Sequence, residues 1–228
     1  MPSIVSTVRA AVGAVVLLTS LSLVPSIGSL PSGRAFAQTA PVAVAQAAQS
    51  DVFARVPCDT PKAIGRLQTA LPVVARKLLL NEPVTIVALG SSSTAGAGAS
   101  SPAFSYPSRL ADDLKRRYPH ASFNVVNRGV NGEEVKDMLA RLDTILADRP
   151  ALVIWQMGTN AVLRDQDAGV AMELAMEGIA RIKAAGADVL LVDLQYAPRV
   201  LAKSETSDML SLIEEVGRVE RISVFRRF

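Results

Sequence analysis

Cysteine and histidine are almost absent from this sequence, which has one of each in 228 residues. With Cys58 as the lone cysteine, an internal disulfide and a metal site built from several cysteines are excluded. The lone histidine, His120, is the one side chain whose ordinary pKa lies near neutrality. Aromatic residues make up 4% of the chain and charged residues 20%, while half of it is hydrophobic. This composition is typical of a globular protein.

A basic excess is also missing from most of the chain. The formal net charge is +3, but Arg9 and Arg34 lie in an N-terminal stretch that contains no acidic residue, and the remainder has 22 basic residues against 21 acidic ones. Proteins that bind nucleic acid keep a basic surface, so we expect no nucleic-acid partner. After the N-terminal stretch the apolar runs are too short to cross a bilayer. We therefore expect a soluble domain without stable membrane insertion once that stretch is removed.

Residues 1–37 have the pattern of an export signal. Arg9 is followed by an almost wholly apolar stretch over residues 10–24, and Ala35-Phe36-Ala37 has small residues at both positions of an A-x-A cleavage site. An uncleaved membrane anchor is the alternative, although two prolines and a glycine interrupt the extended apolar span. Residues 38–60 are predicted to be a flexible leader. The protein is thus expected to be exported, and to be periplasmic or secreted.

Short apolar runs alternate with helical periodicity from residue 61 onward. Buried-type strands are predicted over residues 84–89, 123–126, 151–157, 189–194 and 222–225. Helical stretches are predicted over residues 61–80, where Pro72 introduces a kink or a break, and over 110–116, 135–146 and 170–182. Strand and helix in turn predict a parallel α/β sheet. Residues 61–228 are therefore expected to form one domain of three layers.

In open α/β sheets, ligands bind at the carboxyl ends of the strands. Here the loop after the first strand, residues 90–98 (GSSSTAGAG), could be taken for a phosphate-binding loop, but it has no lysine where a Walker A motif needs one. A dinucleotide fingerprint would need glycine where Ser92 stands. Nucleotide binding is therefore disfavoured. What remains is a serine at a strand-to-helix turn, suited either to a nucleophile or to a helix N-cap.

Three motifs follow three predicted strands in order. They are Gly90-Ser91-Ser92-Ser93-Thr94-Ala95-Gly96, Asn127-Arg128-Gly129-Val130-Asn131-Gly132 and Gly158-Thr159-Asn160. In order and spacing they resemble the SGNH (GDSL-like) esterase and lipase superfamily. The resemblance implies a flavodoxin-like, three-layer α/β/α sandwich with a mainly parallel sheet. It also implies ester hydrolysis through an acyl-serine intermediate, with a small-molecule or polysaccharide ester as the substrate and with neither a metal nor an organic cofactor.

The resemblance also implies roles for individual residues. Ser92 stands at the position of the nucleophile, and the oxyanion hole would consist of the Ser92 N–H, the Gly132 N–H and the Asn160 side-chain amide. Glycine lets the main chain approach a carbonyl oxygen, and an amide donates to negative charge without titrating. The plainer interpretation, a turn glycine at 132 and a cap or turn residue at 160, stays open.

Two departures from the superfamily pattern affect these expectations. Ser91 stands where the superfamily usually has aspartate, which leaves the nucleophile and the donors in place. The second departure is larger, because the chain has no Asp-x-x-His motif near its C-terminus. His120 is preceded three residues earlier by Arg117, so it is predicted to be a solvent-facing loop residue and not the catalytic base. A serine without a general base is a poor nucleophile.

The end of the chain suggests an explanation. The predicted fifth strand, residues 222–225, is followed only by Arg226-Arg227-Phe228. In the superfamily a further helix and the Asp-x-x-His loop would come next, so we expect a form truncated at its C-terminus, with hydrolysis impaired by the loss of the catalytic His and Asp. The lost segment could also have held a partner for Cys58. The alternative is a non-catalytic domain that binds an acyl or carbohydrate group.

Overall fold

The computed structural model describes residues 66–227. The predicted signal peptide and leader, Cys58 and residues 61–65 of the predicted domain lie outside that range. The expectations for those segments therefore stay predictions. Across the described range, no helix has the length and apolar character needed to cross a bilayer.

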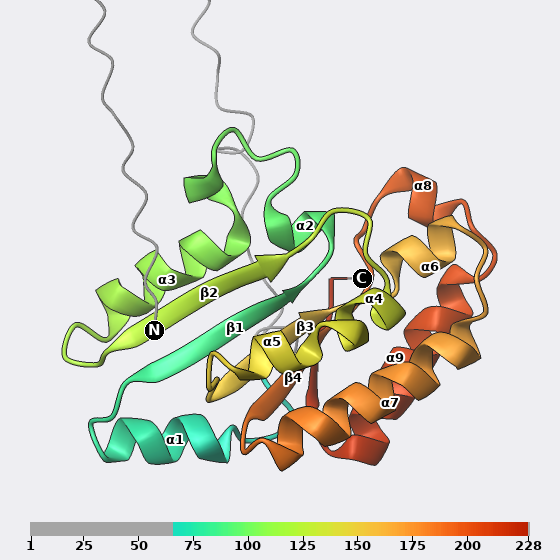
Figure 1. Ribbon diagram of the computed structural model, residues 1–228. Helices are drawn as coiled ribbons and strands as arrows, with labels where there is room; N and C mark the ends of the chain where they lie inside the picture. Colours follow the sequence, from blue (N-terminus) through green and yellow to red (C-terminus); the bar gives the residue numbers. More distant parts are fainter. Residues whose placement is uncertain (1–65, 228) are drawn as a thin grey trace, which may run out of the picture. The chain divides into compact units, whose positions relative to one another are not determined.

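Five parallel strands form one sheet in the order β2-β1-β3-β4-β5 (Figure 1). The strands are β1 (Val84–Gly90), β2 (Phe123–Gly129), β3 (Leu152–Gln156), β4 (Asp188–Val192) and β5 (Ser223–Phe225). The three inner strands are buried on both faces, which explains why they read as continuous apolar runs. Each strand overlaps a predicted run, so the mainly parallel α/β fold class is confirmed.

Helices cover both faces of the sheet (Figure 1). On one face, Ile86 and Ile154 pack with apolar side chains of α1 and α3. On the other, Val87 and Trp155 pack with side chains of α4, α7 and α9. Neighbouring strand residues thus enter different cores, as the two-residue period of a strand requires. The helices are α1 (Pro72–Leu79), α2 (Ser92–Ala95), α3 (Tyr106–Arg117), α4 (Val135–Ala140), α5 (Leu142–Leu146), α6 (Thr159–Leu163), α7 (Ala168–Ala184), α8 (Pro198–Leu201) and α9 (Thr206–Glu220), with a 3-10 turn, η2, over Pro102–Phe104.

Two helix predictions differ from the structure, and one long helix was not predicted. The helix expected over residues 61–80 begins only at Pro72, and residues 66–71 are not helical. Proline lacks an N–H and has a preset φ, so it starts this helix instead of kinking it. The single stretch predicted over residues 135–146 is two helices that meet at Arg141. The 15-residue α9 was missed, although the spacing of its buried residues Met209, Ile213 and Val216 is helical.

The strand order determines where a site can form. The chain passes from β1 to β2 on one side and then returns to place β3 on the other side of β1. The connection through α3, which follows β1, lies on one face, and the connection through α7, which follows β3, lies on the opposite face. The loops that leave the carboxyl ends of β1 and β3 therefore run to opposite faces, and in doubly wound sheets ligands bind at such a point.

Asp188 stabilises the opposite, amino-terminal edge of the sheet. Its Oδ2 accepts hydrogen bonds from the N–H groups of Val73 and Val74, at 2.9 and 3.0 Å, in the first turn of α1. We expect Asp188→Ala to lower the free energy of unfolding by about 1–3 kcal/mol, because two N–H groups lose their acceptor. Asp188→Asn keeps an oxygen at that position and is expected to retain most of the stability. Urea unfolding of both variants at neutral pH tests this.

The pH dependence of the free energy of unfolding shows whether the ionised carboxylate of Asp188 raises or lowers stability. Burial raises the pKa of the Asp188 carboxyl, and the two N–H groups oppose that shift. A raised folded-state pKa contributes stability below the ordinary carboxyl pKa, and this contribution is lost as the pH rises through the folded-state pKa. Asp188→Asn has no such proton, so its free energy of unfolding should rise relative to that of the unsubstituted chain as the pH increases from the ordinary carboxyl pKa of about 4 through the raised folded-state pKa. If the difference in free energy of unfolding between the two proteins did not change with pH, the raised pKa of Asp188 would be contradicted.

Candidate active site

Ser92, Gly132 and Asn160 lie in the loops that follow three neighbouring strands. Ser92 is the first residue of α2, directly after β1, Gly132 lies between β2 and α4, and Asn160 lies in α6 after β3. Since β1 lies between β2 and β3, the candidate nucleophile is in the middle of the three. Hydrogen bonds then connect these loops to one another. The structure therefore brings the three predicted segments together at one edge of the sheet.

Ser92 lies in a tight strand-to-helix turn. The carbonyl of Ser91 accepts from the N–H groups of Thr94 and Ala95, at 3.1 and 2.9 Å, and the carbonyl of Ser92 accepts from Gly96 at 3.0 Å. Within residues 66–227, neither the Ser92 hydroxyl nor the Ser92 N–H makes a hydrogen bond, which leaves both free for a substrate. Because α2 has only four residues, its dipole contributes less at Ser92 than a long helix would.

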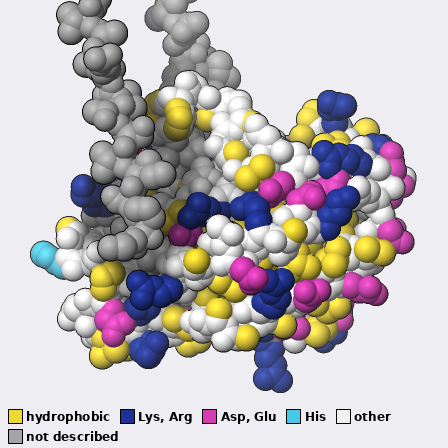
Figure 2. All heavy atoms as spheres, in the orientation of Figure 1, with side chains coloured by type: hydrophobic (Ala, Val, Ile, Leu, Met, Phe, Trp, Pro, Cys, Tyr) yellow, Lys and Arg dark blue, Asp and Glu magenta, His cyan; other side chains and the backbone are white. Residues whose placement is uncertain are grey.

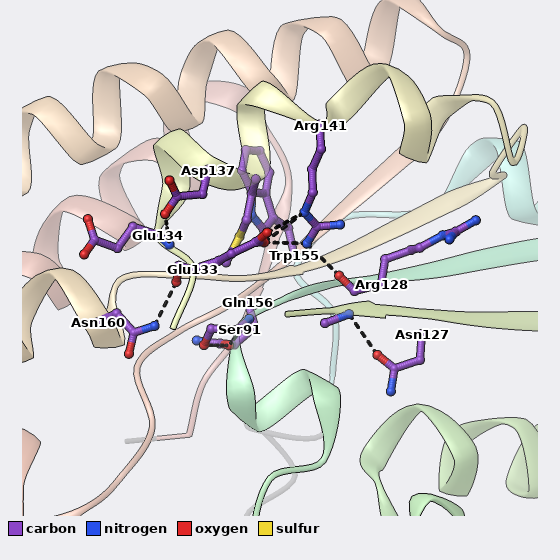
Figure 3. Close-up of polar contacts among 12 residues, drawn as sticks. Ser91, Asn127, Arg128, Glu133, Glu134, Asp137, Arg141, Trp155, Gln156 and Asn160 are labelled. Atoms are coloured by element: carbon purple, nitrogen blue, oxygen red, sulfur yellow. Dashed lines mark hydrogen bonds and ion pairs between the residues drawn. The ribbon is translucent and has the colours of Figure 1, made fainter. Parts of the chain in front are cut away.

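Asn127 and Gly129 hold α2 against the end of β2. The Asn127 amide nitrogen donates to the carbonyl of Thr94 at 3.0 Å. Its oxygen accepts from the N–H of Gly129 at 2.9 Å (Figure 3). A Cβ on Gly129 would lie 2.2 Å from the backbone nitrogen of Ala95. Such a contact is sterically forbidden, so glycine is required where these two segments cross. The structure thus gives these two motif residues a structural role.

Gly132 has the backbone conformation and the free donor that its predicted role needs. Its φ is +80°, a region that favours glycine. Among the described residues, an added Cβ would meet only Arg164 Nη2, at an ordinary 3.5 Å. Backbone conformation, more than crowding, therefore accounts for glycine here. The N–H of Gly132 makes no hydrogen bond within the described part of the chain.

Asn160 connects the third loop to the second. Its Nδ2 donates to the carbonyl of Glu133 at 2.8 Å (Figure 3). An amide nitrogen carries two N–H groups, so one donor remains for a substrate oxygen. The neighbouring Arg141 holds the second loop at both ends, because it donates to the Glu133 carboxylate at 2.6–2.9 Å and to the carbonyl of Arg128 at 2.7 Å. The loop that carries Gly132 is therefore well constrained.

A second ion pair ties α4 to α6. Glu134 is the N-cap of α4 and forms a capping box with Asp137. The Glu134 side chain is 5% exposed and pairs with Arg164, the C-cap residue of α6. Sequence reasoning missed this pair, because the two residues are 30 positions apart and neither belongs to a recognised motif. The pair holds the helix that carries Asn160 beside the loop that carries Gly132.

Two ionisable side chains near these loops, Tyr106 and Arg227, are held in protonated states that do not suit a general base. Burial raises the pKa of the Tyr106 phenol, and the opposing effects of Thr94 and of the positive charge of Arg227 offset this only in part. Tyr106 therefore stays protonated at neutral pH. Asp193, directly after β4, is buried and accepts from the N–H of Arg227 at 2.8 Å. Burial lowers the pKa of Arg227, whereas the Asp193 carboxylate raises it.

His120 lies far from the three loops along the strand direction. It is exposed, in the turn between α3 and β2, which is the amino-terminal end of β2. The strands are parallel, so His120 and Ser92 are at opposite edges of the sheet. His120 is therefore the solvent-facing loop residue predicted from the sequence, and it does not serve Ser92 as a base.

Gln156 was not predicted, although the structure places it at the centre of the site's hydrogen bonding. It is the last residue of β3, is 1% exposed, and contacts the Ser92 turn. A signal was present, because a polar residue ends an otherwise apolar strand (LVIWQ). Such a residue at the carboxyl end of a central strand is well placed to face a ligand site.

The strand order, the serine turn after β1 and the two donor loops beside it define the fold class as that of the SGNH hydrolases. A sequence model of the non-GDSL lipase-like family matches residues 57–228. The chain belongs to this family. Esterase TesA of Pseudomonas aeruginosa is 30% identical over 128 residues, which cover 49% of this chain and 61% of that protein. The chain thus spans less than two thirds of this relative.

Solved structures agree on the fold. The crystal structure of TesA, at 26% identity, superposes with a TM-score of 0.54 over 61% of this chain and 76% of that one. AlinE4, an SGNH-hydrolase family esterase, is 23% identical, with a TM-score of 0.55 over 63% and 75% of the two chains. A two-domain esterase active on acetylated mannans is 20% identical, with a TM-score of 0.60 over 71% of this chain and 42% of that one.

Proposed function

We propose that this protein is a serine ester hydrolase that acts through an acyl-serine intermediate, with Ser92 as the nucleophile. The observation that carries the proposal is the Ser92 turn, where a hydroxyl and an N–H without hydrogen-bond partners among the described residues stand beside the donor loops of Gly132 and Asn160. Family membership and the similarity to an esterase support the same reaction.

The proposed reaction uses Ser92 and the three N–H donors of this chain, together with a base that is not assigned among the described residues. The Ser92 oxygen attacks the ester carbonyl, and its proton passes to a base. The resulting oxyanion accepts hydrogen bonds from the Ser92 N–H, the Gly132 N–H and the remaining N–H of Asn160. These donors are already in position, so they stabilise the negative charge as it forms. The C–O bond to the alcohol then breaks, and the alcohol leaves with a proton. Water hydrolyses the acyl-serine and restores the hydroxyl.

We further propose that this 228-residue chain hydrolyses esters slowly. Its one histidine lies at the opposite edge of the sheet, and Tyr106 stays protonated. No described group is therefore assigned to take the Ser92 proton. Loss of one triad member removes several orders of magnitude in rate. The alternative is a non-catalytic module that binds an acyl or carbohydrate group at the same donors, and it is favoured by the position of His120 at the edge of the sheet opposite Ser92.

Covalent labelling tests the identity of the nucleophile. A fluorophosphonate, with imidazole added as a base, should phosphonylate Ser92. The oxygen–phosphorus bond forms, fluoride leaves and imidazole takes the proton. Peptide mass spectrometry is expected to find one adduct, on the peptide that contains Ser92, and none in Ser92→Ala. An adduct on another serine, or no adduct under any condition, would overturn the proposed function.

Substrate and location complete the proposal. A carbohydrate O-acyl ester is the substrate class we propose, in line with the neighbour active on acetylated mannans. We also propose that the protein is exported through residues 1–37 and acts in the periplasm or outside the cell. Determination of the mature N-terminus from the native host would test the export signal, and an uncut Met1 would contradict cleavage.

A further inference from the structure

We propose that Gln156 is a positioning residue for the Ser92 nucleophile, an inference that rests on the proposed function. Its Oε1 accepts from the Ser91 hydroxyl at 3.1 Å and from the Ser91 N–H at 3.3 Å (Figure 3). The same oxygen accepts from the Ser93 hydroxyl at 3.0 Å. The residues immediately before and after Ser92 are thus fixed to one atom. Ser92 itself is left without a hydrogen bond among the described residues.

The orientation of the Gln156 amide is settled by its partners. A backbone N–H only donates, so the group that faces Ser91 must be the carboxamide oxygen and not the nitrogen. The residue is 1% exposed, and no bulk water replaces these contacts if they are lost. A side chain without an acceptor would leave the Ser91 N–H and two hydroxyls unpaired in a buried site. Loss of this buried acceptor should therefore disturb the conformation of the Ser92 turn more than loss of an exposed hydrogen bond would.

The nitrogen of the same amide reaches toward the oxyanion side of the site. Gln156 Nε2 lies 3.5 Å from Thr159 Oγ1, and Thr159 Oγ1 accepts from the Gln195 N–H at 3.0 Å. Thr159 directly precedes Asn160 in α6. Gln156 therefore contacts both the turn that carries Ser92 and the turn that carries Asn160, the candidate oxyanion donor.

The residue at position 91 is matched to this acceptor. Ser91 presents a hydroxyl donor to Gln156 Oε1, whereas an aspartate there would direct a carboxylate at the same oxygen and repel it. A neutral donor at 91 and a neutral amide at 156 thus act as a pair. The pair keeps the turn in one conformation without a charge near the oxygen that attacks.

The test measures the fluorophosphonate labelling of Ser92 in the full chain with imidazole present. Gln156→Leu is expected to lower the limiting labelling rate by about 100-fold, the loss typical of a small misplacement of a reacting atom. The probe concentration that gives half-maximal rate should stay unchanged. Ser91→Ala and Ser93→Ala each remove one hydroxyl and should slow labelling by less than about tenfold. Gln156→Glu offers an acceptor of the same shape and should label at least about tenfold faster than Gln156→Leu.

Ser223→Ala is the matched control. Ser223 is fully buried and accepts from the Thr69 N–H at 2.9 Å, at the start of β5 and away from the carboxyl edge. It should lose stability but keep the labelling rate. A wild-type chain that is not labelled at all would overturn the proposed function and the positioning role together. Labelling of the wild-type chain and of Gln156→Leu within about threefold of each other would overturn the role of Gln156 alone.

Discussion

Imidazole is expected to raise the Ser92-dependent hydrolysis of p-nitrophenyl acetate by about 100-fold, from a negligible rate without it. The Ser92 hydroxyl and the candidate oxyanion donors are in place, whereas the only histidine is at the opposite edge of the sheet. A diffusible base would take the Ser92 proton that no described side chain is assigned to take. The measurement is the release of p-nitrophenol by the 228-residue chain over a series of imidazole concentrations.

Ser92→Ala is the control for this experiment, since imidazole hydrolyses the same ester by itself. The variant rate is subtracted, and what remains is the reaction at Ser92. A fast reaction without imidazole would show that the base has been assigned wrongly. Acceleration no greater than that of Ser92→Ala would contradict an impaired esterase and favour the binding module.

Replacing the Asn160 amide is expected to have the second-largest effect. Asn160→Ala should lower the imidazole-dependent rate by about 10²–10³-fold, the usual loss when one oxyanion donor is removed. Two consequences combine, because one N–H of this amide holds the carbonyl of Glu133 at 2.8 Å and the other is proposed to meet the oxyanion. Asn160→Asp should be as slow, since a carboxylate repels both the Glu133 carbonyl and the developing negative charge.

Asn131→Ala is the matched control for Asn160→Ala. Asn131 is an exposed asparagine next to Gly132, and its side chain makes no hydrogen bond within residues 66–227. Its replacement should change the rate by about twofold or less, because exposed positions without such contacts tolerate substitution. If Asn160→Ala kept the full rate while remaining folded, the assignment of the oxyanion hole would be wrong.

Most of the sheet could be predicted from the sequence. A central parallel strand is buried on both faces, and this requirement alone makes β1, β3 and β4 readable as apolar runs. Helix bounds were less accurate. Pro72 begins α1 instead of kinking it, and Arg141 separates two short helices, because local context and packing decide such points. The missed α9 had a clear helical spacing, so that error was one of pattern recognition.

The candidate site could be predicted from the sequence only in part. Ser92, Gly132 and Asn160 were predicted to take part in it because each stands in a motif that follows a strand, and their roles stay predictions. Gln156, Arg141 and the pair of Glu134 with Arg164 were missed. Each of these acts through partners that are distant in sequence, and no local pattern encodes such a partner.

The amino-acid sequence by itself determined where the five strands lie along the chain, the parallel α/β class and the placement of three polar loops after three strands, because these depend on local periodicity and chain direction. Only the tertiary structure decided which of those loops are neighbours and which buried side chains hold them. It placed Gln156 in contact with the residues before and after Ser92, and it placed His120 at the opposite edge of the sheet. Contacts between distant segments depend on how the layers pack, and that packing is a property of the whole domain.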